Sequence, residues 1–180
     1  MTGVFGAVLC GGPSSRMGVD KATIPVDGVA MARRVADALI AAGCSPVSAI
    51  GGDPAELDRL GLDCVIDQHP GDGPLGGILT ALAVQAPVAV VACDLPGLSA
   101  ATVKSLLDAL GDHDAAIAFS DRAEPLCAVW SDRAVPVLRA RFQAGERAMH
   151  RAIDGLDIAW VTVAPTDLHN INTPGDLGNL

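Results

Sequence analysis

The chain has 180 residues, 50% of them hydrophobic and 18% charged, which is enough apolar material for one sizeable core and too little for two ordinary domains. Asp and Glu number 21 against 12 Lys and Arg, and the net charge of −9 argues against nucleic acid or an anionic membrane as a partner. No apolar stretch approaches the roughly 20 residues of a membrane span, and the first residues lack the pattern of a signal peptide. The 5 cysteines include no C-x-x-C pair for zinc or redox chemistry. We therefore expect a single domain, residues 1–180, in the reducing cytoplasm.

Short apolar runs alternate with helical patterns through the first two thirds of the chain. Strands are predicted at residues 4–9, 46–50, 64–66, 87–92 and 115–119. Helices are predicted at residues 31–42, 55–60, 76–85 and 100–110, the last of them capped by Ser99. The strands are too apolar to face water on either side, which is typical of a parallel sheet that helices cover on both faces.

The last third of the chain is less regular. Strands are predicted at 126–130 and 158–163, and helices at 134–142 and 146–153, so mixed strand pairing is expected there. Trp130 and Trp160 fall in these strands and are expected in the core. The sequence contains no internal repeat and no long linker. The predicted fold class is therefore α/β, a single three-layer sandwich around a mostly parallel sheet.

The loop after the first strand carries the residue types of a phosphate site. It consists of LCGGPSSRMGVDK over residues 9–21. Glycines allow backbone N–H groups to converge on an anion, and the Ser, Arg and Lys side chains add donors and positive charge. The spacing fits neither a Walker A loop nor the G-x-G-x-x-G dinucleotide fingerprint. A glycine-rich turn with a surface Arg and Lys is the structural alternative.

Two further strand ends carry candidate polar residues. The loop at 67–77, DQHPGDGPLGG, could present backbone groups to a nucleobase and the Asp67 carboxylate to a ribose, although a tight loop with a capping Asp would look similar. Asp94 comes just after the apolar run at 87–92 and could hold a hard cation such as Mg²⁺, or cap a helix. Ligands of open α/β sheets bind outside the carboxyl ends of the strands, where these loops would meet. Together the three strand ends predict a nucleoside triphosphate site.

Five motifs resemble those of the molybdenum cofactor guanylyltransferase family of nucleotidyltransferases. They are LCGGPSSRMGVDK, GPLGGI, CDLP, EPLCAVW and NINTPGDL, and they span almost the whole chain. The glycine pair and the Asp-Lys ending of the first motif resemble the GTP-using branch more than the CTP-using cytidylyltransferases. Cys10 departs from the family's usual Ala, and both side chains are small enough for the turn. The resemblance implies a Rossmann-like three-layer fold of the nucleotide-diphospho-sugar transferase type.

The resemblance also implies a reaction, the Mg²⁺-dependent transfer of GMP from GTP to the terminal phosphate of molybdopterin, with or without its molybdenum, and release of pyrophosphate. By similarity, Arg16, Lys21 and Asp94 are catalytic, and Asp94 holds the Mg²⁺ cofactor. The residues expected against the nucleotide are Leu9, Cys10, Gly11, Gly12, Lys21, Asp67, Gly76 and Asp94. Those expected at the acceptor are Pro125, Leu126, Arg147, Asn170 and Asn172, with Glu124 beside them. Transient contact with molybdoenzymes or other cofactor-biosynthesis proteins is implied as well.

Two other kinds of function stay open from the sequence. A related nucleotidyltransferase would use CTP or a sugar phosphate acceptor, and a non-catalytic nucleotide-binding module would keep the glycine loop without turnover. Arg16, Lys21 and Asp94 together favour an enzyme, because a module that only binds needs fewer charged groups. The 4 histidines show no paired spacing for a metal, and Cys93 is expected to be a small buried residue.

Overall fold

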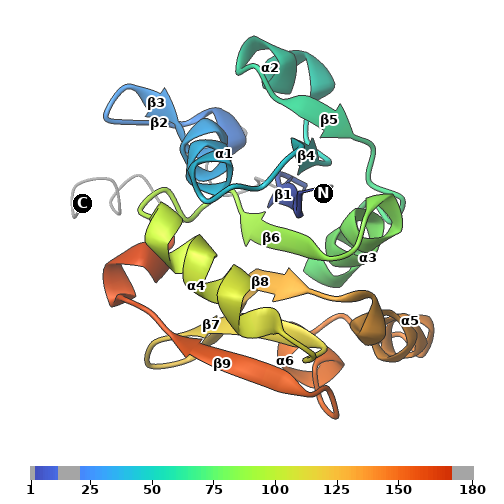
Figure 1. The fold of residues 1–180 in the computed structure, drawn as a ribbon. Coiled ribbons are helices and arrows are strands. Elements are labelled where there is room, and N and C mark those ends of the chain that lie inside the picture. Colours follow the sequence, from blue (N-terminus) through green and yellow to red (C-terminus); the bar gives the residue numbers. More distant parts are fainter. Residues whose placement is uncertain (1–2, 12–20, 172–180) are drawn as a thin grey trace.

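A seven-stranded sheet runs through the part of the chain that the computed structural model describes, residues 3–11 and 21–171 (Figure 1). Its strand order is β5-β4-β1-β6-β8-β7-β9. The strands are β1 (Phe5–Leu9), β4 (Val47–Ile50), β5 (Asp63–Val65), β6 (Val88–Ala92), β7 (Ala115–Phe119), β8 (Ala123–Trp130) and β9 (Ile158–Thr162). Neighbouring strands are parallel except that β8 is antiparallel to both β6 and β7. The predicted mostly parallel sheet, with mixed pairing in the last third, is confirmed.

The reversed direction of β8 brings residues of the last third of the chain to the site edge of the sheet. Only residues 120–122 connect β7 to β8, and so short a connection requires an antiparallel pair. Val91 of β6 pairs with Cys127 of β8. The first residues of β8 therefore lie beyond the carboxyl end of β6, beside the loop that begins at Cys93.

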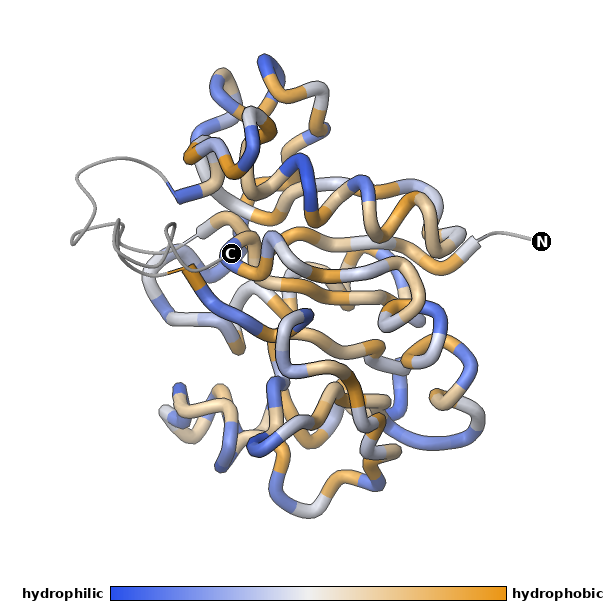
Figure 2. The backbone as a smooth tube through the Cα atoms, turned by 90° about the vertical axis from the view of Figure 1, so that its left-hand side faces the viewer, coloured by the Kyte–Doolittle hydropathy of each residue, from blue (hydrophilic) through white to orange (hydrophobic). Residues whose placement is uncertain are grey.

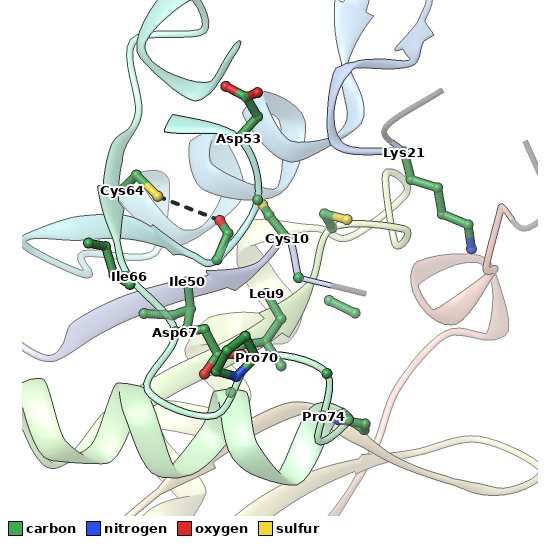
Figure 3. A pocket seen from close by; sticks show the side chains of 18 of the residues that line it. Leu9, Cys10, Lys21, Ile50, Asp53, Cys64, Ile66, Asp67, Pro70 and Pro74 are labelled. Carbon is green, nitrogen blue, oxygen red and sulfur yellow. Dashed lines mark hydrogen bonds between the residues drawn. The ribbon is translucent and has the colours of Figure 1, made fainter. Parts of the chain in front are cut away.

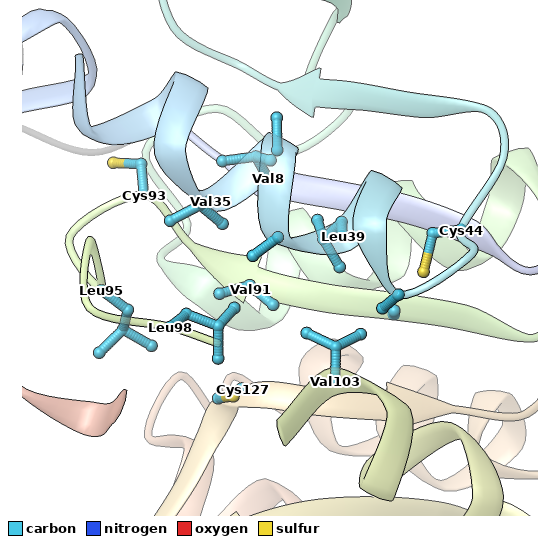
Figure 4. Packing of buried hydrophobic residues seen from close by; sticks show 14 of the residues in the cluster. Val8, Val35, Leu39, Cys44, Val91, Cys93, Leu95, Leu98, Val103 and Cys127 are labelled. Carbon is cyan, nitrogen blue, oxygen red and sulfur yellow. The ribbon is translucent and has the colours of Figure 1, made fainter. Parts of the chain in front are cut away.

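Helices cover both faces of the sheet. On one face lie α1 (Met31–Ala41), α2 (Pro54–Arg59) and α4 (Ala100–Leu110), and on the other lie α3 (Pro74–Val84), α5 (Val135–Gln143) and α6 (Met149–Ala152). Successive strand residues point to opposite faces, so Val91 packs under α1 and α4 (Figure 4) while Val90 packs under α3. Figure 2 shows the hydrophobic stretches gathered in the middle of the molecule and the hydrophilic ones toward its outside. The predicted three layers are confirmed.

Local sequence signals explain where the helices begin. Ser99 caps α4, its hydroxyl accepting from the N–H of Thr102 at 3.2 Å, as predicted. Asp53 caps α2 by accepting from the N–H groups of Ala55 and Glu56. Helices α2 and α3 each have a proline in their first turn, where its missing N–H costs nothing. No helix in the described ranges is long and apolar enough to cross a bilayer.

A small hairpin, β2 (Pro25–Val26) with β3 (Val29–Ala30), was not predicted from the sequence. Its turn residues, Asp27 and Gly28, both have positive φ, at 50° and 81°. Asp-Gly between two apolar residues is a strong signal for such a turn, so the signal was present in the sequence.

The two tryptophans differ in burial. Trp130 is completely buried, as expected, but the expectation for Trp160 is wrong because 52% of that residue is exposed. Trp160 belongs to β9, which is an edge strand, and its ring lies roughly perpendicular to that of Phe119, with ring centroids 6.3 Å apart. An edge strand leaves one flank without a neighbour, so an aromatic residue there stays partly in water.

The short helix η3 (Pro165–Leu168) fastens the chain after β9 to the loop between β6 and α4. Asp167 is 8% exposed, and its Oδ2 accepts from the Ser99 hydroxyl at 2.6 Å, from the Ser99 N–H at 3.2 Å and from the Thr102 hydroxyl at 2.5 Å. The N–H of Ile171 donates to the Asp94 carbonyl at 3.0 Å. These bonds fix both ends of the loop at residues 94–99.

The buried position of Ile117 in β7 predicts a large cost for its truncation. Ile117 has no exposed surface, and Ile117→Ala should lower the free energy of unfolding by about 2–5 kcal/mol, because it removes buried methyl groups and leaves a cavity. Urea unfolding followed by circular dichroism measures this change. Ile40→Ala, at a helix residue that is 49% exposed, is the matched control and should change stability by less than about 0.5 kcal/mol. Equal losses in the two variants would contradict the burial described here.

The hydrogen bonds of Asp167 predict a second stability effect. Asp167→Ala leaves the buried hydroxyl of Thr102 and that of Ser99 without their acceptor, and should cost about 1–3 kcal/mol in the free energy of unfolding. Asp37→Ala is the control, because Asp37 is exposed and makes a surface ion pair with Arg33 that is worth about 0–1 kcal/mol. If Asp167→Ala is as stable as the parent in urea titrations, the three bonds do not hold the loop.

Candidate functional site

A cavity of about 740 Å³ opens at the carboxyl ends of the parallel strands β1, β4, β5 and β6 (Figure 3). Backbone hydrogen bonds continue between the chains just past these strands, from Cys10 N–H to the Ile50 carbonyl at 3.0 Å, from Gly51 N–H to the Val65 carbonyl at 2.9 Å and from Cys93 N–H to the Leu9 carbonyl at 3.1 Å. The cavity is lined by Leu9, Cys10, Gly11, Lys21, Ile50, Gly51, Gly52, Asp53, Pro54, Cys64, Ile66, Asp67, Pro70, Gly71, Gly73, Pro74, Gly77, Ala92, Cys93, Asp94 and Leu126. The three strand ends singled out in the sequence therefore meet in one cavity.

The backbones that leave β1 and β4 approach each other closely at one side of the cavity. A Cβ atom on Gly51 would lie 3.2 Å from the Cα of Gly11, and one on Gly52 would lie 3.1 Å from the Cβ of Cys10. Both Gly51 and Gly52 also have positive φ. Only glycine fits such positions without strain, and their bare backbone is open to a ligand. This glycine pair was not among the predicted site residues, although it follows an apolar run in the sequence just as the Gly11-Gly12 pair does.

Asp67 caps its loop and also faces the cavity. Its Oδ1 accepts from the N–H of His69 at 2.9 Å and from the Thr80 hydroxyl at 2.8 Å. Its Oδ2 points toward Gly11, 3.8 Å from where a Cβ atom on that residue would lie. The capping role and a ligand-facing role, which the sequence left as alternatives, are thus compatible in one carboxylate.

Charged groups stand at another side of the cavity. The Lys21 Nζ lies 3.4 Å from Oδ2 of Asp94, and the two side chains are 23% and 21% exposed. Glu124 lies nearby on β8, and burial raises the pKa of its carboxyl, with a further upward contribution from the negative charge of Asp94. An ammonium group and a carboxylate that both reach the cavity suit a ligand carrying phosphates and a hard cation.

The carboxylate of Asp94 is compatible with the binding of Mg²⁺. Within the described ranges no three His, Cys, Asp or Glu side chains are grouped as a complete metal site. Mg²⁺ does not need such a group, because it usually binds one or two carboxylates and takes its other ligands from water and substrate phosphates. Asp94, partly exposed at the cavity wall, can supply one such oxygen ligand.

The residues expected at the acceptor are divided between several places. Leu126 lines the main cavity. Asn170 lines a second cavity of about 430 Å³, together with Ser120, Asp121, Arg122, Glu124, Pro165, Leu168 and His169. Pro125 lies between Glu124 and Leu126 in β8 and lines neither cavity. Arg147 also lines neither, and its guanidinium group is instead paired with Asp72.

Gly76 has a packing role in place of the expected contact with the cavity. It lies in the first part of α3 and is buried, but the cavity wall is formed by its neighbour Gly77. A Cβ atom on Gly76 would come within 2.7 Å of the Cβ of His69, so glycine lets the loop before α3 pack on the helix. Gly12, Arg16 and Asn172, also expected at the site, lie outside the described residues.

Cys93 is buried, as predicted, with 8% of its surface exposed at the cavity. Leu9, Cys10, Gly11, Lys21, Asp67 and Asp94 of the expected nucleotide set all line the cavity as well.

The chain is similar to known proteins over most of its length. The MobA-like NTP transferase domain matches residues 6–169. A probable molybdenum cofactor guanylyltransferase of Chloroflexus aggregans is 34% identical, over 96% of this chain and 90% of that protein. The molybdenum cofactor guanylyltransferase of Rhodobacter capsulatus is 33% identical, over 97% and 93%.

A solved structure with the same arrangement is that of molybdopterin-guanine dinucleotide biosynthesis protein A from Archaeoglobus fulgidus. It superposes with a TM-score of 0.79 at 25% identity, covering 98% of this chain and 96% of that one. The sheet order, the cavity at its carboxyl edge and the nearly full-length match lead to one conclusion: the chain belongs to the MobA-like NTP transferase family.

Proposed function

We propose that this protein transfers GMP from GTP to the terminal phosphate of molybdopterin, producing the guanine dinucleotide form of the cofactor and pyrophosphate. The observation that supports this most directly is the cavity itself, where glycine backbone, Asp67 and the Lys21–Asp94 pair line one space. Relatives that match this chain over most of their length carry the name molybdenum cofactor guanylyltransferase. In this proposal the acceptor is molybdopterin, with or without molybdenum.

The two sides of the cavity suggest how GTP would lie. The glycine backbone at 51–52 and the carboxylate of Asp67 suit the guanosine, because backbone groups and a carboxylate can pair with the polar edges of a base and a ribose. Lys21 and Asp94 suit the triphosphate end. Arg16 would add a second cation there, as the family resemblance implies.

The reaction needs no nucleophile from the protein. An oxygen of the acceptor phosphate forms a bond to the α-phosphorus of GTP, the bond from that phosphorus to the bridging oxygen breaks, and pyrophosphate leaves with the electron pair. Lys21 offsets the charge that accumulates on the leaving group. Asp94 would hold Mg²⁺, which supplies positive charge to the phosphate oxygens when bound. The other residues that line the cavity orient the substrates and exclude water.

The strongly acidic chain makes this local arrangement necessary. With a net charge of −9, the protein as a whole repels a triphosphate. Binding must therefore depend on cationic groups and backbone donors placed within the cavity. We further propose that the enzyme acts in the cytoplasm and passes its product to molybdoenzymes through transient contacts.

A panel of nucleotides tests the function directly. The purified protein with Mg²⁺ and molybdopterin should release pyrophosphate with GTP and not with CTP, ATP or UTP. Preference for CTP would overturn the guanine assignment and favour a cytidylyltransferase, the second candidate. Absence of turnover with all four nucleotides would contradict nucleotidyl transfer to molybdopterin.

The charged pair predicts the effects of two substitutions. Asp94→Ala should abolish turnover, and Lys21→Ala should lower kcat by about 10²- to 10³-fold, because each removes charge stabilisation at the phosphates. Steady-state pyrophosphate release measures both effects. Asp108→Ala and Lys104→Ala are controls of the same chemical types on the exposed surface of α4 and should leave the rate unchanged. Full activity of Asp94→Ala with Mg²⁺ present would remove Asp94 from the metal role.

A further inference from the structure

The loop at residues 66–73 has two sides. One side forms a wall of the cavity, through Ile66, Asp67, Pro70, Gly71 and Gly73 (Figure 3). The other side packs against α5 and the turn that joins α5 to α6, where the ring of His69 lies 4.6 Å from that of Phe142. Figure 1 shows α5 beside α3, the helix that follows this loop. Contacts on the outer side of this loop therefore affect the shape of the cavity wall.

Arg147 makes the main polar contact on that outer side. Its Nε donates to Oδ1 of Asp72 at 3.1 Å, and its Nη2 lies 3.0 Å from the same oxygen. Its Nη1 donates to the carbonyls of Phe142 and Glu146, both at 2.9 Å. The guanidinium carbon also lies 4.0 Å from the centroid of the Phe142 ring, in a cation–π contact. One side chain thus connects the α5–α6 turn to the loop.

These contacts hold most of the Arg147 guanidinium group against the protein. Nε and Nη1 of its guanidinium group donate to protein oxygens, and Nη2 lies 3.0 Å from Oδ1 of Asp72 in the ion pair. Among the described residues it lines neither of the two cavities. An acceptor contact through Nε or Nη1 would replace the bonds to Asp72, Phe142 and Glu146.

The two ends of the loop differ in how firmly they are held. Near its start, Asp67 accepts from Thr80, and the N–H of Gln68 donates to the same hydroxyl at 3.1 Å. Toward its end the chain turns at Gly71 and Gly73, both with positive φ. Two contacts hold Asp72. Its N–H donates to the His69 carbonyl at 3.1 Å, and its carboxylate accepts from Arg147. Glycines add conformational freedom, so this second half depends more on its side-chain contacts.

We propose that Arg147 is a positioning residue for the nucleotide: through Asp72 and Phe142 it holds the loop at 66–73 in the conformation that completes the cavity wall. The inference rests on the proposed function, since it takes the cavity as the nucleotide site. It differs from the family-based expectation by assigning Arg147 to the GTP side of the reaction. Loss of Arg147 should therefore weaken nucleotide binding without direct effect on the acceptor.

The first test needs no ligand and so does not depend on the proposed function. Hydrogen–deuterium exchange of the full chain should show faster exchange at residues 66–76 in Arg147→Ala than in the parent. Asp72→Ala should show the same change, and the double variant should exchange no faster than Arg147→Ala, because the two substitutions remove one shared contact. Arg133→Ala, which removes an exposed ion pair with Asp112, is the control and should leave the loop unchanged. Unchanged exchange in Arg147→Ala would overturn the proposal.

The second test separates the two substrates. In Arg147→Ala the Kd for GTP should rise by roughly three- to tenfold, whereas the KM for molybdopterin at saturating GTP should stay the same. Arg147→Lys keeps the charge but not the two-nitrogen contact, so it should fall between the parent and Arg147→Ala. A raised KM for molybdopterin with an unchanged Kd for GTP would show an acceptor contact and overturn the proposal. Failure of the parent protein to bind GTP would instead contradict the proposed function. The hydrogen–deuterium exchange experiment would still test whether Arg147 holds the loop, because it needs no ligand.

Discussion

The alignment of four parallel strand ends is the constraint on which the site depends. Three backbone hydrogen bonds beyond the strands, starting at Cys10, Gly51 and Cys93, keep the departing chains side by side. Residues far apart in the sequence consequently open into one cavity. A loss of register in any of these strands would displace a cavity wall, so the packing of the sheet between two helix layers also maintains the site.

The second half of the chain contributes to the site through the reversed strand β8 and the segment after β9. Antiparallel pairing places Glu124 beyond the end of β6, near Asp94, and brings Leu126 to the cavity wall. Asp167 and Ile171 then bind the loop at 94–99 from its outer side. The backbone of the loop that carries Asp94 is therefore held by a segment about 70 residues further along the chain.

Charge is used locally in a protein that is acidic overall. In the proposed function the Lys21–Asp94 pair serves the triphosphate. The glycine backbone at 51–52 and Asp67, which accepts from Thr80 and His69, serve the guanosine on the other side of the cavity. Arg147, beside the loop that forms one wall of the cavity, is paired with Asp72 and donates to two carbonyls. Its position illustrates that a charged residue expected at the acceptor by similarity can act on the site through a neighbouring loop.

The sequence by itself determined the order of the helices and of the strands of the main sheet, the Ser99 cap, the mostly parallel pairing and the strand ends that carry Asp67 and Asp94. Apolar period and capping chemistry are local properties. Only the tertiary structure decided that Gly77 and not Gly76 meets the cavity, and that Gly51 joins it. It also decided that Trp160 lies on an edge strand and that Arg147 pairs with a partner 75 residues away. Such choices depend on which side chains the packed elements bring together, and no local pattern contains that information.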